Sequence, residues 1–303
     1  MNYPTVIIGG ATASRKTELA IAIAKKFPSV IINADSLQVY KDFSILTNRP
    51  NNKECQNLRF RLFGLISPPE SPNLGWWRKL VIKELKRANS ENILPIIVGG
   101  TGLYINSLEN NISKIPDVKI KVRNQISKIL KKKGLDFLYK KLQKLDSISY
   151  KKLNKNDKQR ILRAIEVKVS TGKTIDFWKT TNTKEEKVLK KYFFIVIKEE
   201  RKILYDRIDK RFKNMLKYGV LDEVNSFLKR QVDPSHPIYK VIGLKNLIKF
   251  LQGELDIETA IQLSQKDTRN YAKRQITWFK NQPKNAIHLE FNEALKFIFK
   301  NLN

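Results

Sequence analysis

Residues 9–17 combine the residue types that proteins use to bind phosphate. Gly10, Lys16 and Thr17 have the spacing of a phosphate-binding loop, G-x-x-x-x-G-K-[ST], but Arg15 occupies the position of its second glycine. In such a loop the backbone N–H groups and the dipole of the following helix bind the anion, a lysine adds positive charge and a threonine hydroxyl can hold Mg²⁺. We therefore predict a phosphate site here, although an ordinary strand-to-helix turn with a solvated lysine also fits these residues.

The segments on both sides of this loop have the patterns of a strand and a helix. Residues 5–8 form a short β-branched run, typical of a buried parallel strand, and apolar residues recur at helical spacing over residues 19–27. Comparable apolar runs predict further strands at residues 29–32, 93–98 and 192–197. Because helical patterns separate these strands, we expect an α/β fold with a central parallel sheet and a helical C-terminal part.

Two of the predicted strands lead into polar side chains. Asp35 and Ser36 follow the strand at residues 29–32, and Thr101 follows the strand at residues 93–98 in a glycine-rich turn. Ligands of open α/β sheets bind at this end of the strands, so both segments should face the phosphate loop. Asp35 fits a general base, an outer-sphere partner of Mg²⁺ or a helix cap, and Thr101 fits a phosphate neighbour or a helix cap.

The chain is strongly basic and becomes lysine-rich and helical after the third strand. Its 59 Lys and Arg against 29 Asp and Glu give a formal net charge of +30. Such a charge favours a polyanionic partner, nucleic acid first, although a composition biased by codon usage explains it equally well. We interpret residues 116–154 as a helical insertion, formed by two amphipathic helices that Gly134 separates, into a core formed by residues 1–115 and 155–303.

Two predicted helices place basic side chains on one face. The first begins after Asn156, which we expect to cap it, and has Arg160 and Arg163 one turn apart. These arginines can clamp phosphates, or they can belong to a solvated face. In the second helix, over residues 266–279, basic residues at spacings of three and four suit an RNA backbone, while the aromatic residues pack inward or stack on bases.

Other features limit the location of the protein and the kinds of site it can form. Cys55 is the single cysteine, so one chain can form neither a disulfide nor a cysteine-based metal site, and a reducing compartment fits. His236 and His288 lack the spacing of metal ligands. No secretory pattern precedes Lys16, and no apolar run approaches the roughly 18 residues of a membrane span. We expect a cytoplasmic monomer with no membrane association.

Taken in order, five segments of this chain resemble the bacterial tRNA dimethylallyltransferase family. They cover almost the whole chain and comprise Gly10 to Thr17, Asp35 to Tyr40, Gly99 to Tyr104, Gln159 to Val167 and Lys273 to Phe279. The resemblance implies a P-loop NTPase or kinase-like core with a central parallel sheet and a helical insertion that contacts tRNA. It also implies transfer of a dimethylallyl group from dimethylallyl diphosphate to the N6 amine of the adenosine next to the tRNA anticodon (adenosine 37).

The resemblance assigns roles to particular residues. Asp35 matches the base that takes a proton from the adenine amine, Thr101 matches a residue near that amine and the diphosphate, and Gln38 matches the residue that reads the extruded adenine. The diphosphate would be bound, with Mg²⁺ on Thr17, by Gly10, Ala11, Thr12, Ala13, Ser14, Arg15, Lys16, Thr17 and, as a weaker match, Arg211. The tRNA contacts would be Asp35, Ser36, Leu37, Gln38, Gln159, Arg160, Ile161, Leu162, Arg163, Lys273 and Arg274.

Arg15 is the main departure from the family pattern. We expect it to have a helical φ, so that its side chain points outward and can strengthen diphosphate binding; a positive φ would strain the loop. The alternatives that remain open are a catalytically impaired RNA-binding paralogue, a prenyltransferase of free adenine nucleotides and a small-molecule kinase. The residues also leave open whether ATP binds the loop in competition with the allylic diphosphate.

Overall fold

A computed structural model describes residues 3–110, 115–181 and 188–302. The chain forms two compact units, one of residues 1–110 and 187–303 and the other of residues 111–186. The second unit therefore begins close to the predicted insertion at residues 116–154 but extends further along the chain. Its helices after residue 154 pack on the insertion, which explains the later boundary. Each unit has a hydrophobic core of its own.

The first unit is built on a six-stranded sheet in which every strand pair is parallel, with the order β3-β2-β4-β1-β5-β6. The strands are β1 (Thr5–Gly10), β2 (Ser29–Asn33), β3 (Arg59–Arg61), β4 (Leu94–Val98), β5 (Tyr192–Ile197) and β6 (Ile287–Leu289). The four predicted strands are confirmed as β1, β2, β4 and β5. The two short outer strands, β3 and β6, were not predicted, and the α/β fold is confirmed.

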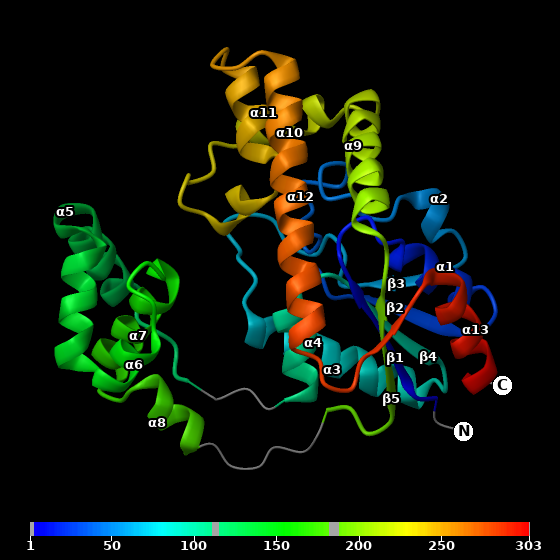
Figure 1. Ribbon diagram of the computed structural model, residues 1–303, viewed down its shortest axis with the longest axis horizontal. Coiled ribbons are helices and arrows are strands. Elements are labelled where there is room, and N and C mark those ends of the chain that lie inside the picture. The colour runs from blue at the N-terminus through cyan, green and yellow to red at the C-terminus, as the bar shows by residue number, and fades with distance from the viewer. Residues whose placement is uncertain (1–2, 111–114, 182–187, 303) are drawn as a thin grey trace. The chain divides into compact units, whose positions relative to one another are not determined.

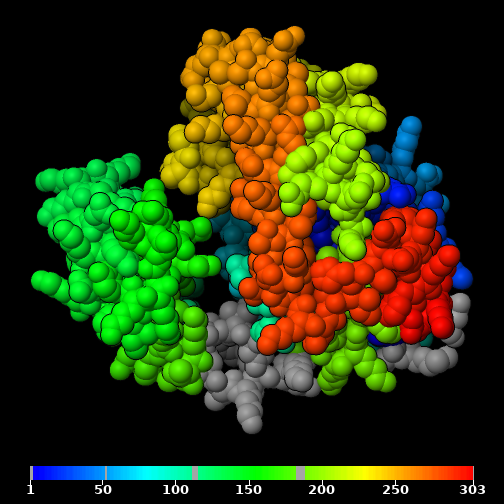
Figure 2. Space-filling view, viewed as in Figure 1, coloured from blue at the N-terminus to red at the C-terminus, as the bar shows by residue number. Residues whose placement is uncertain are grey.

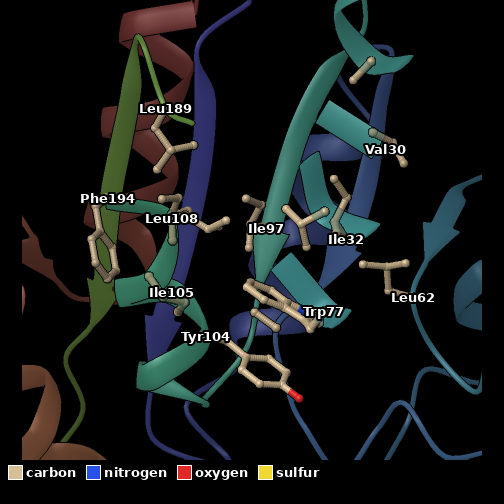
Figure 3. Close-up of a cluster of buried hydrophobic side chains, with 14 of the residues drawn as sticks. Val30, Ile32, Leu62, Trp77, Ile97, Tyr104, Ile105, Leu108, Leu189 and Phe194 are labelled. Atoms are coloured by element: carbon tan, nitrogen blue, oxygen red, sulfur yellow. The ribbon is translucent and has the colours of Figure 1, made fainter. Parts of the chain in front are cut away.

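Helices cover both faces of this sheet (Figure 1). Val6 and Ile8 of β1 pack with α1 (Lys16–Ala24) and α13 (Phe291–Leu302). Ile7 belongs to the opposite core, with α3 (Leu74–Ser90) and α4 (Gly102–Glu109). There the rings of Trp77 and Tyr104 stack with their centroids 4.4 Å apart, and Figure 3 shows them beside Ile97 of β4. This double burial explains the continuous apolar runs of the strands.

Further helices complete the first unit, and the longest of them also runs down along the sheet in Figure 1. They are α2 (Asn52–Cys55), α9 (Arg201–Lys217), α10 (Val220–Leu228), the 3₁₀ helix η1 (Pro237–Lys240), α11 (Leu244–Leu251) and α12 (Ile257–Asn281). A second core, which includes Phe43, Phe212 and Leu244, joins α9, α10 and α11 to the loop after β2. The helical C-terminal part is thus confirmed.

The second unit consists of helices in its described residues. They are α5 (Ile120–Leu145), α6 (Ser147–Lys152), α7 (Lys158–Thr171) and α8 (Ile175–Thr180). Gly134, with φ +77° and ψ 176°, interrupts α5, as predicted from the sequence. The prediction that Asn156 caps α7 was wrong, because the Asp157 carboxylate accepts the hydrogen bond from the Arg160 backbone N–H. Over the described ranges, no helix is long and apolar enough to cross a bilayer.

Candidate active site

The predicted phosphate loop connects β1 to the N-terminus of α1. Gly10 ends the strand with φ +142°, and a Cβ there would lie only 3.0 Å from the Ser14 hydroxyl oxygen. Helix α1 begins at Lys16, so the N–H groups of its first turn have no acceptor within the helix. These donors and the positive end of the helix dipole make the loop a site for an anion.

Lys16 lies inside this loop. Its ammonium donates a hydrogen bond to the Ala11 carbonyl oxygen and lies 3.5 Å from the Ser14 hydroxyl. Burial lowers the pKa of Lys16 to about 8, with Asp35 opposing that shift and Arg211 adding to it. Lys16 therefore loses its proton closer to neutral pH than an ordinary lysine does, and an anion beside it would favour its protonated form.

The backbone of Arg15 differs from our expectation. Its φ of +66° and ψ of 21° are left-handed, so the prediction of a helical φ was wrong. The position just before α1 requires the left-handed turn for which the usual motif has glycine. The side chain forms a 2.7 Å ion pair with Glu18 and lies over the Phe291 ring of α13, 3.9 Å from its centroid. The loop therefore keeps its shape at a cost in backbone strain.

We expect Arg15→Ala to be less stable than Arg15→Gly by about 1 kcal/mol, because only glycine adopts the left-handed conformation without penalty. Both variants lose the same contacts with Glu18 and Phe291. The difference between their free energies of unfolding therefore isolates the cost of the left-handed backbone conformation. Urea denaturation of the two proteins measures it. Equal free energies of unfolding would show that the loop is not held in this conformation.

Asp35 lies just beyond the end of β2 and is positioned by Asn33. The buried Asn33 amide donates to the Asp35 carbonyl oxygen at 2.9 Å, and its oxygen accepts the Asp35 N–H at 2.8 Å. The Asp35 carboxylate in turn accepts the Leu37 N–H at 3.0 Å, in a turn and not at a helix start. Burial raises the pKa of Asp35, while the Leu37 N–H, Lys16 and Arg211 oppose this shift.

Thr101 follows β4 and meets the Asp35 segment. Its hydroxyl oxygen accepts the Ser36 N–H at 3.0 Å and lies 3.3 Å from the Ser36 hydroxyl. Although Thr101 is the residue before α4, its side chain does not cap that helix. Burial and Asp35 raise the pKa of Tyr271, and Thr101 opposes this shift. The strand ends of β2 and β4 thus meet as the sequence predicted.

Arg211 of α9 reaches the phosphate loop from the C-terminal part of the chain. Its guanidinium donates to the Thr12 hydroxyl at 2.9 Å, and burial lowers its pKa to about 10, with Asp35 opposing the shift. One turn earlier, Arg207 is paired with Glu199, and both arginines line the polar cavity described next. Sequence reasoning missed Arg207, although its spacing of four from Arg211 was a usable signal.

Two adjacent cavities join these groups. The larger, of about 300 Å³, is polar, and its lining includes Ala13, Ser14, Lys16, Thr17, Asp35, Gln38 and Arg211. The smaller has a mixed lining, with an apolar wall that includes Leu37, Leu46, Ile208, Phe212 and Met215, and it shares Thr12, Asp35 and Arg211 with the larger one. A cationic loop and a group of apolar side chains therefore meet at Asp35. In the wall of the larger cavity, the Gln38 amide nitrogen donates to the carbonyl oxygens of Thr47 and Asn48 at 2.9 and 3.2 Å.

The predicted tRNA contacts fall in both units. Gln159 and Arg160 are exposed on α7, and Arg163 is half-buried, but Ile161 is fully buried in the core of the second unit, where Leu162 also packs. The Ile161 side chain holds α7 to α5, so the predicted tRNA contact at this residue could go only through its backbone and stays a prediction.

Helix α12 supplies two of the predicted tRNA contacts in the first unit, and the segment Asp35 to Gln38 after β2 supplies the others. Helix α12 reaches the surface along much of its length (Figure 2), and Lys273 and Arg274 are exposed on it. Arg269, on the basic face predicted for this helix, is instead paired with Asp209 at 2.6 and 2.9 Å. The exposed charge of α12 is thus smaller than its sequence suggests.

Comparison with known families identifies the chain. The model of the family described as IPP transferase matches residues 38–282, and that of isopentenyl transferase matches residues 4–64. The chain belongs to the IPP transferase family. Within this family, it is 39% identical over 285 residues to the tRNA dimethylallyltransferase of Pelagibacter ubique, covering 94% of this chain and 91% of that protein.

Solved structures of IPP transferases have the same fold. A tRNA isopentenylpyrophosphate transferase from Staphylococcus epidermidis is 31% identical with a TM-score of 0.67, covering 99% of each chain. A eukaryotic dimethylallyltransferase acting on tRNA is 26% identical with a TM-score of 0.81, covering 96% of this chain and 74% of that one. These likenesses confirm the P-loop NTPase-like core predicted from the sequence.

Proposed function

We propose that this protein transfers a dimethylallyl group from dimethylallyl diphosphate to the N6 amine of the adenosine next to the tRNA anticodon. The observation that supports this best is the meeting, at Asp35, of a cationic phosphate loop and a cavity with an apolar wall. An allylic diphosphate has an anionic end that suits the loop and an apolar end that suits the cavity wall. The names of the relatives, tRNA dimethylallyltransferases at 39% and 37% identity over most of the chain, agree with it.

The phosphate loop would stabilise the departing diphosphate. Cleavage of the carbon–oxygen bond leaves negative charge on the diphosphate, and donors aimed at that charge lower the barrier. In this chain those donors are the N–H groups at the start of α1, the Lys16 ammonium and the Arg211 guanidinium. The loop therefore would assist departure of a leaving group and not transfer of a phosphoryl group.

Mg²⁺ is part of this proposal. Among the described residues, no three His, Cys, Asp or Glu side chains group into a metal site. This fits Mg²⁺, which usually binds one or two protein oxygens together with substrate phosphates and water. The Thr17 hydroxyl, in the first turn of α1 and in the cavity wall, would be the protein ligand. When bound, the ion would neutralise part of the diphosphate charge.

The apolar wall of the smaller cavity and Asp35 would serve the two reacting atoms, the allylic carbon and the attacking nitrogen. Leu46, Ile208 and Phe212 offer the five-carbon group an apolar surface, which also keeps water away from an electrophilic carbon. The Asp35 carboxylate, its pKa raised by burial, would accept the proton that the adenine amine loses on attack.

The adenine must leave its stack to reach this site. Because the Gln38 amide protons go to loop carbonyls, Gln38 would read the base through its oxygen.

A transfer assay separates this function from its alternatives. Purified protein is given Mg²⁺, labelled dimethylallyl diphosphate and either tRNA or AMP as the acceptor. The tRNA should be labelled at N6 of one adenosine, and AMP should remain unlabelled. Label on AMP would instead indicate a nucleotide prenyltransferase, and phosphate transfer from ATP to a small molecule would indicate a kinase. Retained tRNA binding without any label transfer would identify an RNA-binding paralogue.

We expect the double substitution Arg160→Ala and Arg163→Ala to weaken tRNA binding about tenfold at 0.1 M salt and to reduce the salt slope by up to about 2. Arg160 is exposed and has only a 3.4 Å ion pair with Asp157. Filter binding over a salt series measures both quantities. Lys168→Ala removes a charge from the same helix outside the predicted segment and should change binding less than threefold. If Lys168→Ala weakened tRNA binding as much as the double arginine variant does, the two arginines would contribute only through the net charge of the protein.

A further inference from the structure

Gln275 of α12 joins the two glycine-containing loops of the active site. Its amide oxygen accepts the Thr12 N–H of the phosphate loop at 2.8 Å, and its amide nitrogen donates to the Gly100 carbonyl oxygen at 2.9 Å. The side chain is only 4% exposed. Since Thr12 follows β1 and Gly100 follows the neighbouring strand β4, one amide bridges two adjacent strand ends.

The glycine-rich turn is shaped to fit this amide. A Cβ on Gly100 would overlap the Gln275 amide nitrogen, and a Cβ on Gly102 would overlap the Trp278 ring of the same helix. Neither glycine has a positive φ, so the need for glycine comes from the close approach of α12 and not from the backbone conformation. The turn and the helix therefore are in direct contact at Gln275.

Tyr271, one turn before Gln275, extends the connection to the reacting groups. Gln275 and Thr101 both oppose the rise in the pKa of Tyr271 that burial causes, and the Thr101 hydroxyl oxygen accepts the Ser36 N–H beside Asp35. Through this series of contacts, α12 reaches the phosphate loop, the Thr101 turn and the Asp35 segment. A neutral amide suits the bridge because it must accept from one loop and donate to the other.

We propose that Gln275 is a positioning residue that sets the distance between the phosphate loop and Thr101, and thus between the leaving diphosphate and the attacking amine. The inference rests on the proposed roles of the loop and of Thr101 in the transfer reaction. Misplacement of reacting groups by about 1 Å can reduce a rate by about a hundredfold. Helix α12, whose exposed face has Lys273 and Arg274, would thereby also determine the geometry of the catalytic loops.

Gln275→Met tests this proposal, because it keeps the volume of the side chain and removes both hydrogen bonds. We expect kcat for transfer to tRNA to fall at least about tenfold, while KM for tRNA stays within about twofold. Gly100→Ala approaches the same contact from the other side, since its Cβ must displace the Gln275 amide. Gly100→Ala should show the same loss of kcat. If Gln275→Met does not fold, Gly100→Ala alone tests whether the Gln275 bridge positions the two loops.

Gln265→Met is the matched control. Gln265 is a second buried glutamine of α12, and its amide donates to the Asp209 carbonyl oxygen at 3.3 Å, away from both loops. This variant should lose thermal stability as Gln275→Met does but keep the native kcat. A native kcat in folded Gln275→Met or Gly100→Ala, or an equal loss in Gln265→Met, would overturn the proposal. Thr101→Ala is measured in parallel, and a native kcat there would contradict the proposed function instead.

Discussion

Asp35→Asn should reduce kcat for transfer to tRNA by about a thousandfold, since a positioned general base contributes about 10²–10⁴. Asparagine keeps the shape and can still accept the Leu37 N–H, now 3.0 Å from the carboxylate, so the turn should persist. It cannot take the proton from the amine. Single-turnover transfer at saturating tRNA and dimethylallyl diphosphate measures the change. Asp206→Asn, at an exposed position of α9, should retain native activity.

The pH dependence gives this prediction a second readout. Because burial raises the pKa of Asp35, its carboxylate gains a proton at a higher pH than an ordinary aspartate, despite the opposing charges of Lys16 and Arg211. The base acts only when deprotonated, so kcat/KM should fall as the pH falls through that raised value. The residual activity of Asp35→Asn should lack this acid limb. If the acid limb persists in Asp35→Asn, another group is the base.

Lys16→Met should lower kcat/KM for dimethylallyl diphosphate by about a hundredfold to a thousandfold, the range for removing one donor to a developing anion. Methionine fills the same space in the loop without the ammonium that now donates to Ala11. KM for tRNA should change little, because the substitution acts on the leaving diphosphate. Steady-state kinetics with each substrate varied in turn measure both effects.

The fall of kcat/KM for dimethylallyl diphosphate at alkaline pH should come from the loss of the proton on Lys16. The pKa of Lys16 is lowered to about 8, so the free protein loses this charge as the pH rises through that value, and kcat/KM for the diphosphate should fall above it. Lys16→Arg keeps a charge that does not titrate there and should move the limb to higher pH, whatever its absolute activity. An unchanged limb in Lys16→Arg would mean that another group titrates.

The central strands could be predicted because their signal is local. Strands β1, β2, β4 and β5 are buried on both faces, so each appears in the sequence as a continuous apolar run. The outer strand β6 has only three residues, two of them exposed, and so lacks that run. The same locality explains why Gly134 could be recognised as a break between helices, whereas the cap of α7 was placed one residue early.

The candidate site was predictable at the strand ends and not beyond them. The phosphate loop, Asp35 and Thr101 follow strands directly, so the sheet topology alone brings them together. The side chains that hold them come from elsewhere or act through buried hydrogen bonds, as Asn33 and Gln275 do, and no spacing in the sequence reveals such contacts. The conformation of Arg15 was mispredicted because the turn required before α1 overrides the ordinary preference of a residue with a Cβ.

The position of β1 between β4 and β5 has a consequence for how the protein is made. Thr5 pairs with Tyr192, so the ribosome must synthesise the whole helical unit before the second edge of β1 finds its partner. Until then that edge is open to wrong pairing with other chains. The Arg211 and Gln275 side chains that contact the phosphate loop emerge later still. The part of the active site that is translated first is therefore the last to be completed, and nascent chains should depend on chaperones during that interval.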